Sequence, residues 1–317
     1  MRMESGWIGN GVPGTLTSDP CRQWRGKTPP AAGGVPSGRV LHCTGLILAA
    51  ALSLGGCAAT QPGSTALPAL PQEAREIQAV KPLVTAGAPF RHLILTHPDL
   101  GPPEKERGEL HVYLEGDGRP WLTRQQIASD PTGSDLLALR LMARDPMQSI
   151  YVGRPCYHGF AADPGCRPWL WTHGRYSPEV VTTMVAAIRS LLPQRPRSRI
   201  SLIGYSGGGV LAILMAPHLE GVVQVITIGA NLDTDAWADL HGYSPLVGSL
   251  NPARQPPLEG GIRQLHLVGE HDARVPLASI ATYLARNPKA SLRVLAGFDH
   301  RCCWLEQWPQ LLKGDPG

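Results

Sequence analysis

The feature that most constrains the fold is a regular alternation of two kinds of segment from about residue 88 onward. Short runs of continuous apolar residues alternate with longer segments in which apolar residues recur at the helical period. The predicted strands cover residues 91–97, 109–116, 149–155, 199–204, 222–230, 263–272 and 291–300. The predicted helices cover residues 135–144, 177–193, 208–219, 276–287 and about 303–313. Strands joined by helical crossovers predict a mostly parallel sheet with helices on both faces.

The length of the chain sets the number of domains. Its 317 residues suffice for one large α/β domain or two small ones. The uninterrupted alternation favours one domain, which we assign to residues 88–317. Only residues 231–260 break the rhythm, and they are too few for a separate domain, so we expect a short excursion above the sheet and a small cap or none.

The charge balance excludes one class of partner. Five of the 29 Lys and Arg and two of the 25 Asp and Glu precede Cys57, so the remainder of the chain is nearly neutral. A balance near zero gives no support for nucleic-acid binding. After the N-terminal region, no segment has the ~20 continuous apolar residues that a membrane span needs.

The N-terminal region has the composition of a targeting signal. Arg39 precedes an apolar stretch from Leu46 to Leu54, and small residues then lead to Cys57. Residues 39–57 are therefore predicted to form a secretory signal segment, too short to span a membrane. Its last four residues, Leu-Gly-Gly-Cys, resemble a bacterial lipobox, and this resemblance implies lipidation of the Cys57 thiol. An uncleaved apolar helix and an ordinary cleaved signal are the alternatives.

The segments on either side of the signal differ from it. Residues 1–38 are rich in Gly and Pro without periodicity, so we interpret them as a disordered lead or as an overextended gene start. Residues 58–87 begin with a small, polar, Pro-rich stretch, which predicts a flexible tether. Ala58 rather than Asp follows the cysteine. By resemblance to Gram-negative lipoproteins, this implies attachment in the cell envelope, at the outer membrane and facing the periplasm.

The remaining cysteines indicate disulfides. Cys156, Cys166, Cys302 and Cys303 follow the signal, and an even number in an exported chain favours pairing. The spacing favours a local bridge between Cys156 and Cys166. The other two either pair with each other or each reach one of the first pair. No CxxC pair has zinc spacing, so no metal site is predicted. Residues 155–176 are long for a strand-to-helix link, and we interpret them as a flap over a pocket.

One serine lies in a setting suited to nucleophilic chemistry. Residues 204–208, Gly-Tyr-Ser-Gly-Gly, fit the pattern G-x-S-x-G, with an apolar strand before and an apolar helix after. This is the setting of a nucleophile elbow. Gly204 and Gly208 lack a Cβ, which lets strand and helix approach closely and holds the Ser206 hydroxyl at the carboxyl edge of the sheet. An idle serine in a Gly-rich turn and a phosphate-binding turn are the alternatives.

A nucleophilic serine needs a base, and the base needs a carboxylate to orient it. On this kind of sheet the chain order is serine, acid, histidine. Two later strand ends supply Asp272 and His300, which we predict as the acid and the base. Both lie at carboxyl ends of strands, where sites in open parallel sheets gather. Glu270 is the alternative acid, and a buried structural histidine is the alternative role for residue 300.

Acyl transfer also needs two hydrogen-bond donors for the oxyanion. The N–H of Gly207, directly after the serine, is the first predicted donor. The second comes from the turn that begins at Glu115, at the end of an early predicted strand. Either Gly116 or Asp117 can supply it, and we choose Asp117. Glu115 stands where the HGGG-type oxyanion loop of esterases and lipases has histidine. The Asp117 carboxylate would oppose an oxyanion unless its side chain turns away. An ordinary Gly-Asp-Gly turn is the alternative.

These motifs together resemble the α/β-hydrolase superfamily over roughly residues 88–317. The stretches "GRPC", "RYSPEVV" and "DHRCCW" also resemble proteobacterial lipoprotein α/β hydrolases of unassigned substrate. The resemblance implies an α/β-hydrolase fold and a membrane-tethered serine esterase, lipase or thioesterase that forms an acyl-enzyme on Ser206. Its expected partners are a small acyl-ester substrate and the lipid bilayer. No cofactor or metal is expected.

Two other functions stay open at this stage. The first is a non-catalytic envelope-binding lipoprotein on the same fold, and the second is a serine peptidase. Ser206, Asp272 and His300 occur in the expected order, which favours an enzyme over a binding protein, because a binding protein needs none of the three.

Overall fold

The computed structural model describes residues 83–87, 90–96, 108–192 and 199–313. The predicted lead, the signal segment with Cys57 and most of the predicted tether lie outside these residues. The predictions made for those segments therefore stay predictions.

The described strands form one eight-stranded sheet in the order β1-β2-β4-β3-β5-β6-β7-β8. β1 pairs antiparallel with β2, and β2 pairs antiparallel with β4. All the other pairings, from β4 across to β8, are parallel. The mostly parallel sheet is therefore confirmed. The strands are β1 (Leu83–Gly87), β2 (Phe90–Thr96), β3 (Glu109–Leu114), β4 (Ser149–Val152), β5 (Arg199–Tyr205), β6 (Val222–Ile228), β7 (Arg263–Gly269) and β8 (Ser291–Leu295).

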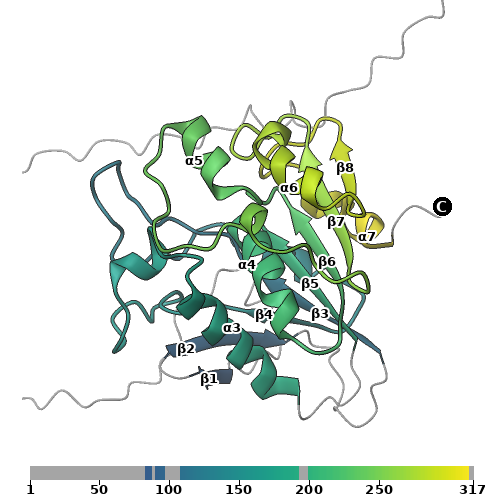
Figure 1. The fold of residues 1–317 in the computed structure, drawn as a ribbon. Helices are drawn as coiled ribbons and strands as arrows, with labels where there is room; N and C mark the ends of the chain where they lie inside the picture. The colour runs from purple at the N-terminus through teal and green to yellow at the C-terminus, as the bar shows by residue number, and fades with distance from the viewer. Residues whose placement is uncertain (1–82, 88–89, 97–107, 193–198, 314–317) are drawn as a thin grey trace, which may run out of the picture.

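Helices cover both faces of the sheet, as predicted. They are α2 (Leu137–Met142), α3 (Pro178–Leu191), α4 (Gly207–Met215), α5 (Thr234–His241), α6 (Ala281–Arg286) and α7 (Trp304–Lys313). In Figure 1, α3 and α4 lie in front of the sheet. The apolar residues of α3 and α4 belong to one buried cluster, and those of α2 and α7 belong to a second. Within the described ranges, no helix is both long and apolar enough to cross a membrane.

The central strands feed both clusters because side chains alternate between the faces of a strand. In β5, Leu202 belongs to the cluster under α3 and α4, whereas Ile203 belongs to the cluster under α2 and α7. In β6, Val225 and Ile226 divide in the same way. Strands buried on both faces read as continuous apolar runs in sequence, which is why they were recognisable there.

The structure moves several predicted boundaries and adds one helix. β1 lies inside the segment predicted as a tether, so the sheet begins at Leu83 rather than near residue 88. The excursion at 231–260 contains the helix α5, with Asp233 as its N-cap and Gly242 at φ 60° at its end. Several predicted strands also ran too far. β7, for example, ends at Gly269 rather than at residue 272, because the chain turns there into the loop that carries Asp272.

Candidate active site

The turn between β5 and α4 holds Ser206 in an unusual backbone conformation. Ser206 has φ 51° and ψ −122°, and its N–H donates a 2.8 Å hydrogen bond to the carbonyl of Ile228. A positive φ is rare for a residue with a side chain and requires support from its surroundings. A Cβ at Gly204 would overlap the backbone of Gly208, and a Cβ at Gly208 would overlap the carbonyl of Leu114. The close approach expected of these glycines is therefore present.

Two hydrogen bonds connect the serine, the histidine and the acid predicted from sequence. His300 Nε2 lies 3.2 Å from Ser206 Oγ, and His300 Nδ1 lies 2.8 Å from Asp272 Oδ2. The other carboxylate oxygen, Oδ1, accepts the N–H groups of Arg274 at 2.9 Å and Val275 at 2.8 Å. With Nδ1–H donating to the carboxylate, Nε2 is left to accept the serine proton. The three side chains are buried or half-buried at the carboxyl edge of the sheet.

The neighbouring candidates make other contacts. Glu270 Oε2 accepts the N–H of Gly297 at 3.1 Å, and the side chain of Glu270 is 53% exposed. His271 is more exposed still. Asp299 Oδ1 accepts two N–H groups of the loop that follows it. The carboxylate that reaches the His300 ring from the end of β7 is that of Asp272, not Glu270.

Two residues that sequence reasoning missed support this arrangement. Gly229, at φ 53° after β6, lies against the acid–histidine pair: a Cβ there would be 3.0 Å from Asp272 Oδ2 and 3.2 Å from His300 Nδ1. Tyr205 donates its hydroxyl to the backbone carbonyl of His300 at 3.1 Å, and the two rings are 5.2 Å apart. The signal for Gly229 was a glycine at the end of an apolar run, on the edge where Ser206 lies.

The two predicted oxyanion donors, the N–H groups of Gly207 and Asp117, differ in their hydrogen bonding from the N–H of Gly116, the alternative donor. The N–H of Gly116 donates to Glu115 Oε1 at 3.0 Å, so it is occupied. Among the residues that the structure describes, the N–H groups of Gly207 and Asp117 have no hydrogen-bond partner. Gly116 itself lies against Ser206, since a Cβ there would be 3.3 Å from the serine Cβ. The turn after β3 is therefore next to the serine, with the Asp117 N–H unoccupied.

The Asp117 carboxylate lies in a cluster of donors, with only 16% of its side chain exposed. Oδ1 accepts Arg154 Nη1 at 2.5 Å, and Oδ2 accepts Arg175 Nη1 at 2.9 Å and the Tyr176 hydroxyl at 2.7 Å. Burial alone would raise the pKa of Asp117, but the two guanidinium groups and the phenol lower it to about 2. The carboxylate is thus ionised, and two positive charges balance it, so it sets no uncompensated negative charge beside an oxyanion.

Glu115 has a different role. Burial raises the pKa of its carboxyl from the ordinary value of 4.5 to about 7. Its Oε2 accepts the N–H of Ala138 at 3.1 Å in the first turn of α2. The residue that stands where the common pattern has histidine therefore ties the turn after β3 to the start of α2.

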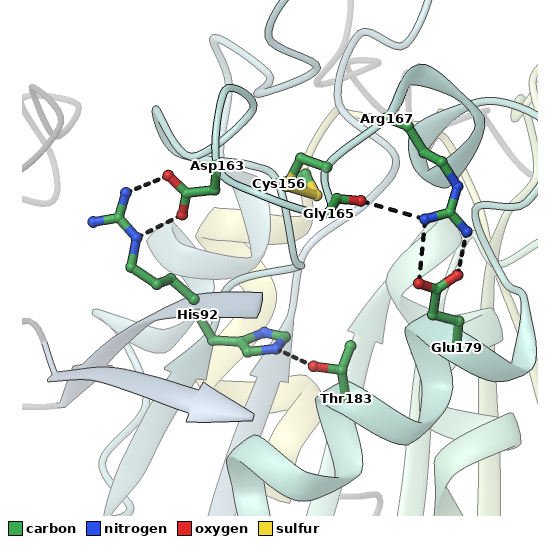
Figure 2. The surroundings of a disulfide bond; sticks show 9 residues. His92, Cys156, Asp163, Gly165, Arg167, Glu179 and Thr183 are labelled. Carbon is green, nitrogen blue, oxygen red and sulfur yellow. Dashed lines mark hydrogen bonds and ion pairs between the residues drawn. A yellow bond between two sulfur atoms is a disulfide. The ribbon is translucent and has the colours of Figure 1, made fainter. Parts of the chain in front are cut away.

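Two disulfides are present among the described residues. Cys156 is bonded to Cys166, which is the pairing that the spacing favours, and Cys302 is bonded to Cys303. Figure 2 shows the surroundings of the first bridge, including an ion pair between Arg167 and Glu179. The second bridge lies in the loop between His300 and α7.

Several other histidines and tryptophans are buried or half-buried outside the line from Ser206 through His300 to Asp272. His158 and His266 are buried, and burial lowers the pKa of each to about 4, so both are neutral. Trp171 is buried and donates its indole N–H to the Ala128 carbonyl at 3.2 Å. Trp121, Trp169 and Trp237 are half-buried. In the described part of the chain, no group of three or more His, Cys, Asp or Glu is arranged to hold a metal ion.

The sheet order, the helices on both faces and the turn that carries Ser206 define an α/β-hydrolase fold, and solved structures agree. A puromycin hydrolase is 17% identical, with a TM-score of 0.53 over 74% of this chain and 38% of that one. A puromycin-hydrolyzing peptidase of Mycobacterium tuberculosis is 16% identical, with a TM-score of 0.52 over 73% of this chain and 37% of that one. An esterase of Pyrococcus furiosus is 12% identical, with a TM-score of 0.52 over 81% of this chain and 100% of that one.

These similarities establish the fold. The chain spans well under half the length of the puromycin hydrolases that it matches but the whole length of the esterase. A scan of protein-family models and a search of curated proteins gave no match.

Proposed function

We propose that this chain is a serine hydrolase that cleaves carboxylic esters or thioesters through an acyl-enzyme on Ser206. The observation that carries the proposal is the continuous hydrogen-bonded line from Ser206 Oγ through the His300 ring to Asp272, with distances of 3.2 Å and 2.8 Å. The backbone N–H groups of Gly207 and Asp117, which have no partner within the described ranges, lie in the two turns that border this serine. Nucleophile, base, orienting acid and oxyanion donors are the parts that acyl transfer requires.

In the first half of the reaction, Ser206 Oγ attacks the carbonyl carbon of the substrate while its proton passes to His300 Nε2. Asp272 stabilises the imidazolium, and the N–H groups of Gly207 and Asp117 bind the tetrahedral oxyanion. The oxyanion then collapses. The bond to the alcohol or thiol breaks, and that leaving group takes the proton from His300 Nε2.

In the second half, His300 Nε2 removes a proton from water, and the hydroxide oxygen attacks the acyl carbon. Collapse of the second tetrahedral intermediate breaks the bond to Ser206 Oγ. The serine recovers its proton from His300, and a carboxylic acid leaves. Besides the substrate and one water molecule, every step uses only groups of this chain.

A fluorophosphonate probe tests the proposal directly, because it forms a covalent bond with an activated serine. We expect labelling of the purified protein and of Ser190→Ala, which removes a hydroxyl on α3 that donates to Ala187. We expect no labelling of Ser206→Ala. Turnover of p-nitrophenyl esters and acyl thioesters of graded length then gives the preferred acyl group, and an aminoacyl amide series tests peptidase activity.

Two results would count against an esterase. Equal labelling of the wild type and Ser206→Ala, or labelling of neither, would favour the non-catalytic binding protein. Labelling with turnover of amides alone would favour the peptidase.

We also propose that the hydrolase is tethered to the outer membrane, facing the periplasm, through a lipid on Cys57. The support is the sequence of residues 39–57, with its apolar stretch and its lipobox-like end. Cells grown with an alkyne-bearing fatty acid should incorporate it into the wild type and into Cys43→Ser, which changes a cysteine upstream of the proposed cleavage point. Incorporation into Cys57→Ser at the wild-type level would refute the anchor.

A further inference from the structure

We propose that the Asp117 carboxylate is a positioning residue for the oxyanion donors, and that the segment between β4 and α3 is a fixed support for it rather than a movable flap. The inference rests on the proposed function, because it assigns a role within the same reaction. Asp117 would act twice: its N–H binds the oxyanion, and its side chain holds that N–H in place.

The first observation is that Asp117 is bound at every acceptor atom. Its two carboxylate oxygens accept three donors, from Arg154, Arg175 and Tyr176. Its backbone carbonyl accepts the Tyr157 hydroxyl at 3.0 Å. Its own N–H is the remaining polar group and has no partner in the described part of the chain. The Asp117 N–H lies in the peptide plane shared with the Gly116 carbonyl, and that plane ends at the Asp117 Cα. The contacts of the Asp117 side chain and carbonyl hold this Cα in place and so limit the direction in which the N–H points.

The second observation is that the donors are not available to substrate. Arg154 is 2% exposed and Arg175 is 7% exposed. Arg154 Nη2 donates to the carbonyl of Arg175 at 2.6 Å, and its guanidinium lies 5.3 Å and 5.5 Å from the rings of Tyr157 and Tyr176. Arg175 Nε donates to the Thr172 carbonyl at 2.6 Å. Buried guanidinium groups with this many partners are part of the framework, not a recognition site for an acidic substrate.

The third observation concerns the other oxyanion donor. A Cβ at Gly207 would overlap the Asp117 carboxylate and would lie 2.7 Å from the Tyr176 hydroxyl. The carboxylate and its phenol partner therefore pack directly against the residue that follows the nucleophile. One buried cluster thus sets the separation between the two donors, which must match the size of a single oxygen.

The segment that supplies the cluster is fastened to the rest of the domain. Within the segment, Cys156 is bonded to Cys166, and Asp163 forms an ion pair with Arg91 of β2. In Figure 2, Cys156 lies between Asp163 and the ion pair of Arg167 with Glu179 of α3. Arg154 and Tyr157 enter the cluster at one end of this segment, and Arg175 and Tyr176 enter it at the other. A segment tied at both ends and at its middle suits a support better than a lid.

The test uses two variants that keep the shape of the cluster, Asp117→Asn and Tyr176→Phe, with the full chain and p-nitrophenyl esters. Tyr283→Phe is the matched control. Tyr283 lies on α6, outside the cluster, and its buried phenol donates to Gln264 Oε1 of β7 at 2.7 Å. For Asp117→Asn we expect kcat to fall by at least about tenfold while KM stays within about twofold, because a misaligned donor weakens only transition-state binding. Tyr176→Phe should lose less in the same direction, and Tyr283→Phe should match the wild type.

A second readout separates positioning from general loss of structure. Ser206 Oγ adds to the carbonyl carbon of an alkyl trifluoromethyl ketone. The product is a hemiketal whose oxyanion binds the N–H groups of Gly207 and Asp117. The inhibition constant of the ketone should rise in proportion to the loss of kcat/KM in both cluster variants, and the unfolding midpoint of Tyr176→Phe should match that of Tyr283→Phe.

The outcomes distinguish this inference from the proposed function. If the wild type is labelled by fluorophosphonate and turns over esters, but Tyr176→Phe and folded Asp117→Asn keep the wild-type kcat and inhibition constant, only the positioning role is wrong. A change in KM alone would overturn it too, because the cluster would then act in substrate binding. If the wild type neither labels nor turns over esters, both proposals fail.

Discussion

The turn after β3 carries two carboxylates, those of Glu115 and Asp117, and their surroundings shift the two pKa values in opposite directions. Glu115 faces the start of α2 and accepts backbone N–H groups, and burial raises its pKa to about 7. Asp117, two residues later, faces the segment between β4 and α3. Burial would raise its pKa as well, but two guanidinium groups lower it to about 2.

The difference teaches that burial does not decide the charge of a carboxylate in this protein. Neutral N–H donors on the Glu115 side are not enough to offset the loss of water, whereas full positive charges on the Asp117 side are. The consequence is a turn with one carboxyl that titrates near neutral pH and one that stays ionised throughout the physiological range.

The largest expected effect on stability comes from removing the Asp117 carboxylate. Asp117→Ala leaves Arg154 and Arg175 buried without their carboxylate, and removing one partner of a buried ion pair costs about 3–5 kcal/mol of unfolding free energy. Urea denaturation followed by circular dichroism measures this. A loss below about 1 kcal/mol would mean that water replaces the carboxylate and that the cluster is not a sealed one.

The next effect comes from the Glu115 side. The folded state raises the pKa of Glu115 from 4.5 to about 7, so it binds more protons than the unfolded state between these values. Stability is therefore lost as pH rises through this window and is level above it.

Glu115→Gln removes this titration. From pH 4.5 to pH 7.5, we expect the unfolding free energy of the variant to gain about 3 kcal/mol relative to the wild type. Parallel urea titrations at several pH values measure the difference. A difference that does not change with pH would show that Glu115 is already ionised at pH 5.

A smaller effect sharpens the comparison at low pH. The folded state lowers the pKa of Asp117 from 3.8 to about 2, so its contribution is fully present above pH 4 and is lost as pH falls through 2. Relative to Asp117→Asn, the wild type should lose about 2 kcal/mol of stability between pH 4.5 and pH 2. Acid unfolding curves of the two proteins measure this loss. Parallel curves across the window would refute the strong ion pairing.

The smallest effect is expected at an exposed ion pair on the same supporting segment. Arg167 and Glu179 are 50% and 35% exposed, so solvent screens their attraction. Arg167→Gln should cost less than about 1 kcal/mol in thermal or urea unfolding. A loss comparable to that of Asp117→Ala would mean that surface fastening, rather than the buried cluster, stabilises the segment.

Much of the fold was predictable because its signals are local. β5, the glycine turn and α4 follow one another within seventeen residues, so apolar runs and glycines reveal them together. β1 escaped notice because it is short, lies at the sheet edge and includes Ala and Gly, which strands disfavour. α5 escaped notice in a Pro-rich and Gly-rich stretch, although its capping residues, Asp233 and Gly242, were readable signals.

The site divides along the same line. Asp272 and His300 could be predicted because each follows a strand end, and parallel strands bring their carboxyl ends to one edge. The partners of Asp117 could not, because Arg154 and Arg175 lie 37 and 58 residues away in sequence and no short pattern connects them to it. From sequence alone, the Asp117 carboxylate was expected to oppose an oxyanion unless it turned away. In the structure the carboxylate packs against Gly207, and the guanidinium groups of Arg154 and Arg175 balance its charge.

The order of residues by itself determined most of the strands and helices, where the glycines allow a tight turn, and which two side chains, those of Asp272 and His300, reach the edge with Ser206. These follow from hydrophobic periodicity and backbone sterics, which act over a few residues. Only the tertiary structure decided the charge states of Glu115 and Asp117 and the direction of the Asp117 N–H. Desolvation and ion pairing depend on which distant groups share a buried volume, and only the packed chain brings them together.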